Sequence, residues 1–265
     1  MSKHLGEYYD NEFYLKEIDG MSKSAEIVLG KLFEHFQPAS VVDVGCGRGA
    51  WLSVAKSLGV TVLTGMDGDW IESDALLTDN IDLVNVNFED SLPLIDEKYD
   101  LCISLEVAEH ISESKADQFV EFLCSTSDVI LFGAAIEQQG GVNHINEQRQ
   151  SYWIERFLNN GYECVDLFRP QLWNDKSVEW WYRQNTFLFL APSCSSLELK
   201  EMREIEKPIW DVVHPENCEF KIDSFNRQLS DPSLKYCMKC LRHYFKNKFR
   251  AIVGGGLCQD SYSLI

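Results

Sequence analysis

The sequence of 265 residues contains no apolar run long enough for a membrane-spanning helix, which needs about 20 predominantly apolar residues. Residues 1–7 are polar and lack the apolar core of a secretory signal peptide. Internal repeats and low-complexity linkers are also missing. These absences argue against a membrane-spanning or secreted protein, and we expect a cytoplasmic one.

The nine cysteines lack the even number and regular spacing of a disulfide framework. Three of them, Cys102, Cys124 and Cys164, lie in apolar runs, where cysteine behaves as a small buried hydrophobic residue. This usage is typical of a reducing compartment. A chain of this length buries a substantial core without such cross-links.

Basic residues are scarce, since 24 Lys and Arg stand against 42 Asp and Glu and the net charge is −18. General binding to nucleic acid needs a basic face that neutralises phosphates, so we expect no nucleic-acid partner. The negative charge is distributed unevenly along the chain. Residues 221–265 carry a net charge of +5, and the rest of the chain carries −23.

This basic tail contains an amphipathic segment, residues 234–250. Its apolar residues recur at three- or four-residue intervals and form one stripe on a helix: Leu234, Met238, Leu241, Phe245 and Phe249. Such a helix suits peripheral contact with an anionic membrane. It also suits docking on the acidic body of the chain or on the second subunit of a homodimer, and docking is the interpretation that we prefer.

The most informative segment is residues 41–52, VVDVGCGRGAWL. A β-branched run ends in a Gly-x-Gly-x-Gly turn, and an apolar helical pattern follows directly. Glycines let the backbone approach a ligand closely, and the first turn of a helix offers free N–H groups. The turn alone does not identify the ligand, because nicotinamide-dependent dehydrogenases use a similar one.

Strand and helix patterns alternate along the chain. Strands are expected at 40–45, 61–66, 82–87, 100–105, 128–134, 162–168 and 184–190. Helices are expected at 22–36, 50–58, 114–125 and 151–158, the first capped by Ser22 or Ser24. This alternation predicts an α/β fold with a doubly wound, mostly parallel seven-stranded sheet of the Rossmann-like type. Ligands of such sheets bind at the carboxyl ends of the strands.

Acidic residues at two strand ends make the pattern more specific. Asp43 lies two residues before the first glycine, and Asp67 ends the next strand. The run YDLCISLEVAEHI at 99–111 closes a later strand with Glu-His. With further matches at 134–148, 151–153 and 179–185, residues 7–192 resemble the class I S-adenosylmethionine-dependent methyltransferases, within a bacterial-type subgroup associated with small molecules and glycans.

The resemblance implies a division of the chain into three parts. Residues 1–37 form a helical arm or lid, and residues 38–192 form the S-adenosylmethionine-binding core. Residues 193–265 form a C-terminal extension, with a helix candidate at 197–206 and the basic amphipathic helix.

The resemblance also implies the cofactor contacts. Asp67 accepts hydrogen bonds from the ribose hydroxyls, and Asp43 orients the glycine loop or reaches the cofactor's ammonium through water. The methionine part passes over the three glycines of the loop, and the remaining contacts come from the later strand ends: Gly45, Gly47, Gly49, Asn87, Phe88 and Leu105. An acid usually meets adenine where Asn87 stands here, so Glu89 and Asp90 stay alternatives, and Phe88 suits the core equally well.

Four residues are candidates for catalysis on the acceptor side. Glu106 directly follows the fourth strand, and His110 comes one helical turn later. His144 lies in a glycine-preceded polar loop after the fifth strand, where a histidine can remove the proton of an acceptor hydroxyl. Glu147 or Asn146 can hold its ring in the required tautomer. A purely structural role for this loop is the alternative.

Metal binding by His144 with Glu147 or Glu106 lacks a diagnostic spacing, so we expect no metal ion. The sequence therefore predicts a methyltransferase that modifies oxygen on a sugar, glycan or other small-molecule acceptor. Transfer to nitrogen or carbon of a metabolite is one alternative. Another alternative is a non-catalytic binding protein with the same fold. A nicotinamide enzyme is the last alternative, and the Glu-His pair at the end of the fourth strand argues against it.

Overall fold

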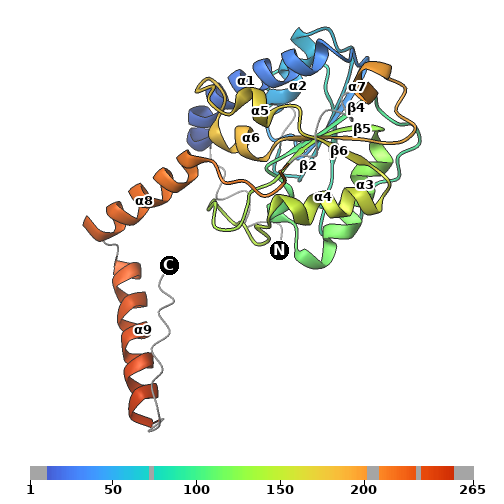
Figure 1. Ribbon diagram of the computed structural model, residues 1–265. Coiled ribbons are helices and arrows are strands. Elements are labelled where there is room, and N and C mark those ends of the chain that lie inside the picture. Colours follow the sequence, from blue (N-terminus) through green and yellow to red (C-terminus); the bar gives the residue numbers. More distant parts are fainter. Residues whose placement is uncertain (1–10, 72–74, 202–208, 231–233, 254–265) are drawn as a thin grey trace. The chain divides into compact units, whose positions relative to one another are not determined.

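The computed structural model describes residues 11–71, 75–201, 209–230 and 234–253. They fall into two compact units, residues 1–217 and 218–265. The first unit is an α/β domain in which a single sheet lies between two layers of helices (Figure 1).

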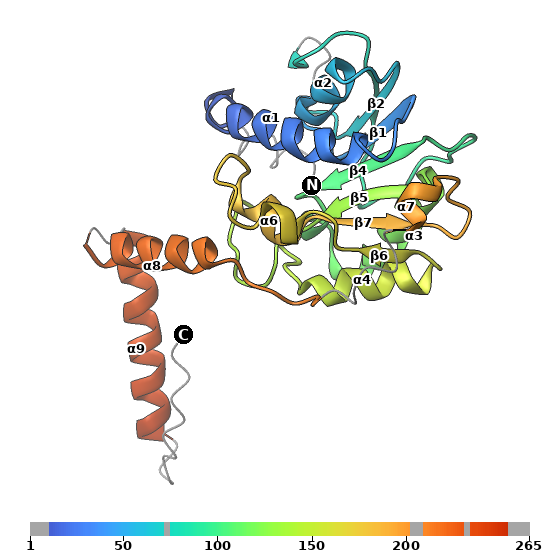
Figure 2. The same cartoon turned by 45° about the horizontal axis from the view of Figure 1, so that its top comes forward.

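The sheet has seven strands: β1 (Ser40–Val44), β2 (Val62–Asp67), β3 (Asp82–Asn85), β4 (Leu101–Leu105), β5 (Val129–Gly133), β6 (Glu163–Val165) and β7 (Phe187–Leu190). Their order is β3-β2-β1-β4-β5-β7-β6, and Figure 2 shows β2 to β6 side by side in this order. β7 runs antiparallel to both of its neighbours, and the other pairs are parallel. The predicted seven-stranded, mostly parallel sheet is confirmed.

Helices cover both faces of this sheet because each carries one apolar stripe. One face holds α1 (Asn11–Phe33), α2 (Ala50–Ser57), α5 (Arg169–Leu172), α6 (Trp180–Asn185) and α7 (Leu197–Glu201). The other face holds α3 (Ala116–Thr126) and α4 (Gln150–Asn159). Two short 3-10 helices, η3 (Ala108–His110) and η4 (Glu113–Lys115), lie between β4 and α3.

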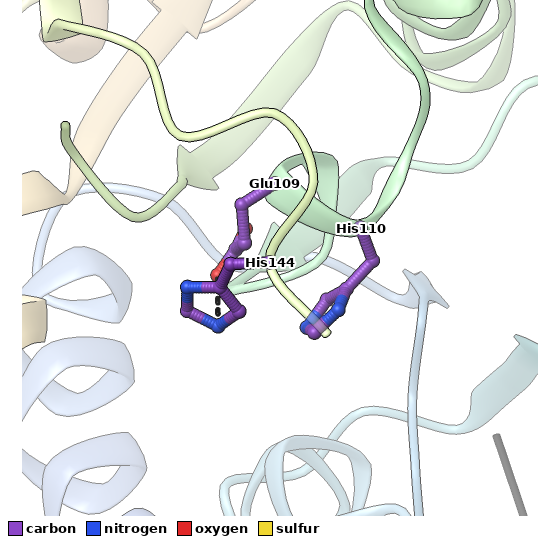
Figure 3. A group of neighbouring side chains, drawn as sticks. All are labelled: Glu109, His110 and His144. Carbon is purple, nitrogen blue, oxygen red and sulfur yellow. Dashed lines mark ion pairs between the residues drawn. The ribbon is translucent and has the colours of Figure 1, made fainter. Parts of the chain in front are cut away.

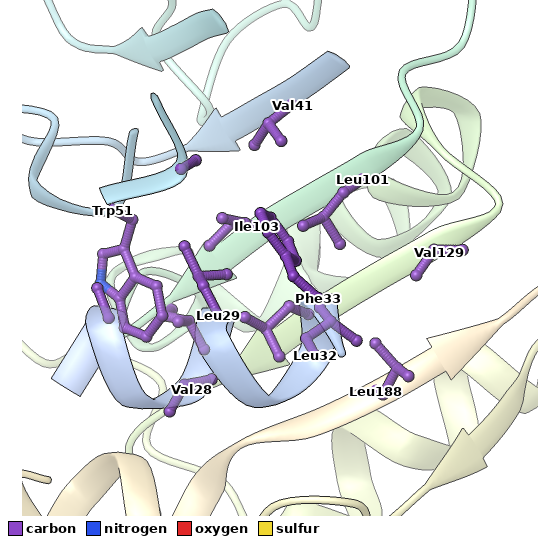
Figure 4. Packing of buried hydrophobic residues seen from close by; sticks show 14 of the residues in the cluster. Val28, Leu29, Leu32, Phe33, Val41, Trp51, Leu101, Ile103, Val129 and Leu188 are labelled. Carbon is purple, nitrogen blue, oxygen red and sulfur yellow. The ribbon is translucent and has the colours of Figure 1, made fainter. Parts of the chain in front are cut away.

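The helix α1 contributes to the core of the domain. Its side chains Val28, Leu29, Leu32 and Phe33 pack over apolar residues of the strands, among them Ile103 (Figure 4). Residues in this part of the predicted arm therefore belong to the body of the fold, whereas residues 1–10 lie outside the described part.

The predicted start of this helix was wrong. α1 already includes Asn11, so Ser22 and Ser24 lie inside the helix and do not cap it. The hydroxyl of Ser24 donates to the carbonyl of Gly20 at 2.7 Å, four residues back. A serine that bonds to the preceding turn is satisfied within a helix, and this is why a cap signal alone misplaced the boundary.

The last predicted strand was partly wrong as well. Residues 180–185 form α6, and β7 begins at Phe187 instead of residue 184. The side chains of Arg183, Gln184 and Asn185 are buried and hydrogen-bonded within the domain. Tertiary contacts of polar side chains therefore decide this segment, and the apolar pattern does not reveal them.

The structural division at 217/218 differs from the predicted end of the core at 192. Residues 209–217 are held by the α/β domain. The guanidinium of Arg169 donates to the carbonyls of Ile209 and Trp210, and the backbone N–H of His214 donates to Gln184 at 2.8 Å. The chain therefore leaves the domain only after this segment.

The described part of the second unit comprises helical residues from α8 (Pro215–Ser230), which begins in the first unit, and α9 (Leu234–Val253). The expected helix over 234–250 lies within α9, whereas α8 was not predicted. None of the helices in the described ranges has the length and apolar character that crossing a membrane requires.

Candidate active site

The glycine loop follows β1 at the carboxyl edge of the sheet. Gly45, Gly47 and Gly49 all have positive φ angles, of 86°, 51° and 76°. At Gly45 a β-carbon would lie 2.2 Å from Cγ2 of Val107, far inside van der Waals contact. Only glycine fits here, and the loop after β1 is thereby held directly against the turn after β4.

The carboxylate of Asp67, at the end of β2, organises the same loop. Its Oδ2 accepts the backbone N–H of Gly47 and its Oδ1 accepts that of Gly68, both at 2.7 Å. Burial raises the pKa of Asp67, and these two N–H groups oppose the rise. The side chain of Trp70 also bonds to this carboxylate, and part of its acceptor capacity remains for a ligand.

Asp43 lies inside β1 and is buried, and its Oδ2 has no hydrogen-bond partner. Burial and, second, the neighbouring Asp67 raise the pKa of Asp43 to about 8. A buried carboxylate oxygen without a partner costs free energy unless a ligand supplies a donor or a positive charge. This oxygen is therefore a strong candidate for ligand contact.

The end of β3 lies farther along the same edge. The amide of Asn87 is engaged locally, since it donates to Asp90 at 2.6 Å and accepts the N–H of Glu89 at 3.2 Å. The ring of Phe88 makes an edge contact with Phe119 of α3, at 5.7 Å between centroids. Phe88 thus packs against the core, and Glu89 is bound to Ser112 at 2.5 and 2.9 Å.

Leu105 is buried at the end of β4, and Glu106 follows with a φ of 57°. A positive φ is uncommon for a residue other than glycine and costs free energy. The amides of Gln139 and Asn185 hold the Glu106 carboxylate, at 2.9 and 3.3 Å. Burial raises its pKa to about 7, and these two bonds oppose the rise.

A buried network of amides extends from Glu106 through the domain. The Oε1 of Gln139 accepts from Asn185 at 2.9 Å and from Gln184 at 3.2 Å. Gln184 in turn accepts the N–H of His214. Sequence analysis missed this network, because isolated Gln and Asn in a polar segment give no signal of burial. It fixes the turn after β4 to the loop after β5 and to α6.

His144 lies in the loop after β5, as predicted, and pairs with Glu147. The ring Nδ1 is 2.9 Å from Oε1 of Glu147, which also accepts the N–H of Gly140 at 2.6 Å. A β-carbon on Gly141 would meet the ring at 2.2 Å, so this glycine allows the imidazole to lie against the backbone. The predicted partnership of His144 and Glu147 is therefore present in the structure.

Two further residues reach His144 from η3. The ring of His110 lies edge-on to that of His144, with centroids 4.9 Å apart, and Oε1 of Glu109 is 3.9 Å from Nε2 of His144. Figure 3 shows these three side chains gathered between the turn and the loop. Burial, with the neighbouring His144, lowers the pKa of His110 to about 4.

Glu109 is fully buried, and sequence analysis gave it no role. Neither of its carboxylate oxygens accepts a hydrogen bond of normal geometry, although the backbone N–H groups of Glu109 and Ala135 lie near the carboxylate. Burial and then the charge of Glu106 raise its pKa well above the ordinary value. The backbone carbonyl of Glu109 accepts the N–H groups of Ile145 and Asn146, both at 3.0 Å, and so ties the loop of His144 to the turn.

The structure thus brings the candidates together in two groups. The loop after β1 joins Asp43 and Asp67 to the glycines, and the turn after β4 joins Glu109 and His110 to His144. Glu106 is bound to the amide network and not to His144. Of the aromatic residues before β7, Tyr182 is buried against Trp51, so it belongs to the core.

Comparisons with known proteins agree with this arrangement. Residues 21–188, more than half of the chain, match a family model described as a methyltransferase domain. The chain is 30% identical over 124 residues to the ribosomal protein L11 methyltransferase of Thermosipho melanesiensis. This match covers 44% of this chain and 47% of that protein. The protein of the same name from Thermosipho africanus is 30% identical over 119 residues, 43% of this chain and 45% of that protein. The chain spans less than half the length of these curated relatives.

Solved structures support the fold. The magnesium protoporphyrin IX methyltransferase of Synechocystis PCC 6803 with bound SAH has a TM-score of 0.51 and 16% identity, covering 69% of this chain and 90% of that chain. The same enzyme with bound SAM has a TM-score of 0.50 and 16% identity, covering 69% and 87%.

The raised pKa of Asp43 leads to a stability prediction. Because the folded-state pKa of about 8 exceeds the ordinary 3.8, ionisation of Asp43 destabilises the fold, and this penalty grows as the pH rises from about 4 to 8. Asp43→Asn removes the titrating group. Its free energy of unfolding in urea should match that of the wild type near pH 4 and exceed it increasingly toward pH 8.

The exposed Asp96 offers a matched control, since Asp96→Asn makes the same chemical change at the surface. The pH dependence of the Asp43→Asn difference is compared with that of Asp96→Asn. An Asp43→Asn difference that is constant, or that favours the wild type at pH 8, contradicts the raised pKa.

Proposed function

Since the chain belongs to the methyltransferase-domain family, we propose that it transfers a methyl group from S-adenosylmethionine to an oxygen atom of a small-molecule or glycan acceptor. The observation that carries this proposal is the buried, unpartnered oxygen of Asp43 beside the glycine loop that Asp67 organises. Both features suit a positively charged ligand with a hydroxylated ring.

The residues present fit this cofactor. S-adenosylmethionine carries an ammonium group, two ribose hydroxyls and a methyl group on a positively charged sulfur. In our proposal Asp43 balances the ammonium, directly or through water, and Asp67 accepts from the ribose hydroxyls with its remaining lone pairs. The three glycines let the methionine part lie against the backbone, and Leu105 lines the end of β4. Asn87 and Phe88 flank the adenine.

The acceptor side is assigned to the turn after β4 and the loop after β5. Val107 contacts Gly45, so this turn directly adjoins the cofactor loop. We assign the acceptor hydroxyl to His144, whose ring Glu147 orients, with Glu106 and His110 beside it. An imidazole held by a carboxylate on one nitrogen is well placed to act on a hydroxyl proton with the other.

The first test concerns Asp67. Asp67→Ala should weaken S-adenosylmethionine binding, measured by titration calorimetry, by roughly 10- to 100-fold, because charge-assisted hydrogen bonds contribute about 1.5–3 kcal/mol each before compensation. Asp69→Ala, an exposed neighbour, is the matched control and should bind like the wild type. Circular dichroism verifies that the variant is folded. Unchanged affinity in a folded Asp67→Ala protein removes this residue from the cofactor site.

The second test concerns His144. His144→Ala should lower kcat by about 10²- to 10⁴-fold while the affinity for S-adenosylmethionine holds, since a positioned base contributes that much. Cofactor turnover is followed across sugars and phenols as hydroxyl acceptors. His35→Ala is the matched control, because its Nδ1 also lies 2.9 Å from a glutamate, Glu198, outside the site.

Amines belong in the same acceptor screen. The likeness to an enzyme named for a protein substrate, a ribosomal protein L11 methyltransferase, makes transfer to an amine nitrogen, a group that proteins carry, the second candidate function. Turnover on amines alone, with normal kcat in His144→Ala, contradicts oxygen transfer. That result would mean that the enzyme accelerates transfer mainly by positioning the two reactants, which suffices for a neutral amine.

For the basic helix α9 the proposal is contact with an anionic membrane surface or with a second copy of the chain. Large apolar side chains of α9 are exposed beside Lys239 and Arg242, among them Leu234, Leu241 and Phe245. Membrane contact predicts that full-length protein sediments with anionic vesicles at low salt, and that Lys239→Gln/Arg242→Gln reduces the bound fraction several-fold. Lys31→Gln/Lys98→Gln carries the same charge change outside α9. No difference between the two double variants leaves association of two chains, measured by sedimentation velocity.

A further inference from the structure

We infer that Glu109, His110 and His144 form a binding site for a divalent transition-metal ion. One potential ligand atom from each of the three side chains lies within 4.8 Å of the others. The inference rests on the proposed function only for the task of the ion, which is to hold the acceptor oxygen. The binding site itself stands on the geometry of these three residues.

The spacing of the three side chains suits one ion. Ligands at about 2.0–2.2 Å from a metal lie roughly 3.0–3.5 Å from one another. The observed distance between Oε1 of Glu109 and Nε2 of His144 is 3.9 Å. The three ligand atoms therefore lie somewhat farther apart than around a bound ion, so binding would draw the side chains together.

The histidines are oriented as metal ligands usually are. The Nδ1 of His144 faces the Glu147 carboxylate at 2.9 Å, and the Nδ1 of His110 lies 3.2 Å from the carbonyl of Asn143. A carbonyl only accepts, so the proton of His110 is on Nδ1 and Nε2 carries the lone pair. An acceptor that fixes the second ring nitrogen is the common outer partner of a ligating histidine.

Glu109 supplies an observation that does not depend on the histidines. Its side chain is fully buried. Both carboxylate oxygens lack a hydrogen bond of normal geometry, and the donors near them are the backbone N–H groups of Glu109 and Ala135. Figure 3 shows the carboxylate directed at the His144 ring. A buried carboxylate in this state is expensive unless a positive charge binds to it. A cation between Glu109 and the two rings supplies that charge.

The chemistry of the three ligands limits the identity of the ion. Two imidazole nitrogens and one carboxylate suit Mn²⁺, Fe²⁺, Co²⁺ or Zn²⁺, whereas Mg²⁺ and Ca²⁺ prefer oxygen ligands. Three protein ligands leave positions open for water or for a substrate oxygen. His144 then acts by holding the ion instead of serving as a free base.

From the sequence we expected no metal, because His144 with Glu147 or Glu106 shows no diagnostic ligand spacing. Glu109 and His110 are separated from His144 by more than thirty residues. The two segments meet only because the backbone N–H groups of Ile145 and Asn146 bond to the carbonyl of Glu109. This tertiary contact closes the site.

The test uses Mn²⁺, because the free ion gives an electron paramagnetic resonance signal. Thiolate side chains bind Mn²⁺ weakly, so the cysteines of the chain interfere little. Titration of the metal-free, full-length protein without cofactor or acceptor should show one bound Mn²⁺ per chain. Glu109→Gln, His110→Gln and His144→Gln should each weaken binding by more than about 10-fold, and Glu147→Gln by about 10- to 100-fold as an outer partner. His35→Gln should bind like the wild type.

Thermal unfolding guards against variants that fail to fold. Mn²⁺ should raise the Tm of the wild type and of His35→Gln in proportion to the logarithm of its concentration. Glu109→Gln removes a buried acid without changing its shape, so it should stay folded and show no Mn²⁺-dependent shift. A Glu109→Gln protein that binds Mn²⁺ like the wild type overturns the inference.

Chelation separates this inference from the proposed function. Methyl transfer to a hydroxyl acceptor that persists in excess EDTA, with no bound Mn²⁺ in the titration, overturns the metal site and leaves the proposed function standing. Specific metal binding without turnover of any hydroxyl acceptor does the opposite. Transfer that is lost in EDTA and restored by Mn²⁺, but not in Glu109→Gln, supports both.

Discussion

Gly45, at the end of β1, lies so close to Val107 that no β-carbon fits between them. This contact sets the distance between the loop after β1 and the turn after β4, and therefore between the proposed cofactor side and the proposed acceptor side of the site. Methyl transfer needs two reactants held at a fixed separation, because positioning supplies much of the rate. A glycine with a φ of 86° is the means by which the two strand ends approach.

The turn after β4, which makes this close approach, has a strained backbone. Glu106 adopts a positive φ, and the amides of Gln139 and Asn185 hold its carboxylate in place. These amides belong to the network that reaches Gln184 and the segment at 209–217. Strain at a functional position persists only where the surroundings over-determine it. The polar interior around Glu106 thus supports the geometry that Gly45 permits.

Much of the fold could be predicted from local signals. The alternation of apolar strands and amphipathic helices predicts the sheet, and the Gly-x-Gly-x-Gly turn with Asp67 predicts the cofactor side, since parallel strands bring their carboxyl ends to one edge. Predictions failed where tertiary contacts override local pattern. Ser24 is satisfied inside α1, and Gln184 and Asn185 end a helix instead of opening a strand.

The arrangement of the proposed acceptor side was predictable only in part. The pairing of His144 with Glu147, three residues apart, is a local feature, and the structure contains it. The burial of Glu109 is not local, because it depends on a loop that returns from β5 and bonds to its backbone. A glutamate next to a histidine at a strand end gives no sequence signal for full burial. What distinguishes Glu109 is therefore visible only in three dimensions.

The buried acids share one physical consequence. Burial is the largest cause of the raised pKa values of Asp43, Asp67, Glu106 and Glu109, and three of the four are raised further by another carboxylate. Carboxylates that destabilise one another in the ligand-free fold bind cations strongly, because each positive charge relieves both burial and repulsion. The cofactor offers an ammonium and a sulfonium, and the cluster at His144 suits a metal ion. Positively charged ligands would thus neutralise the buried carboxylates of this site.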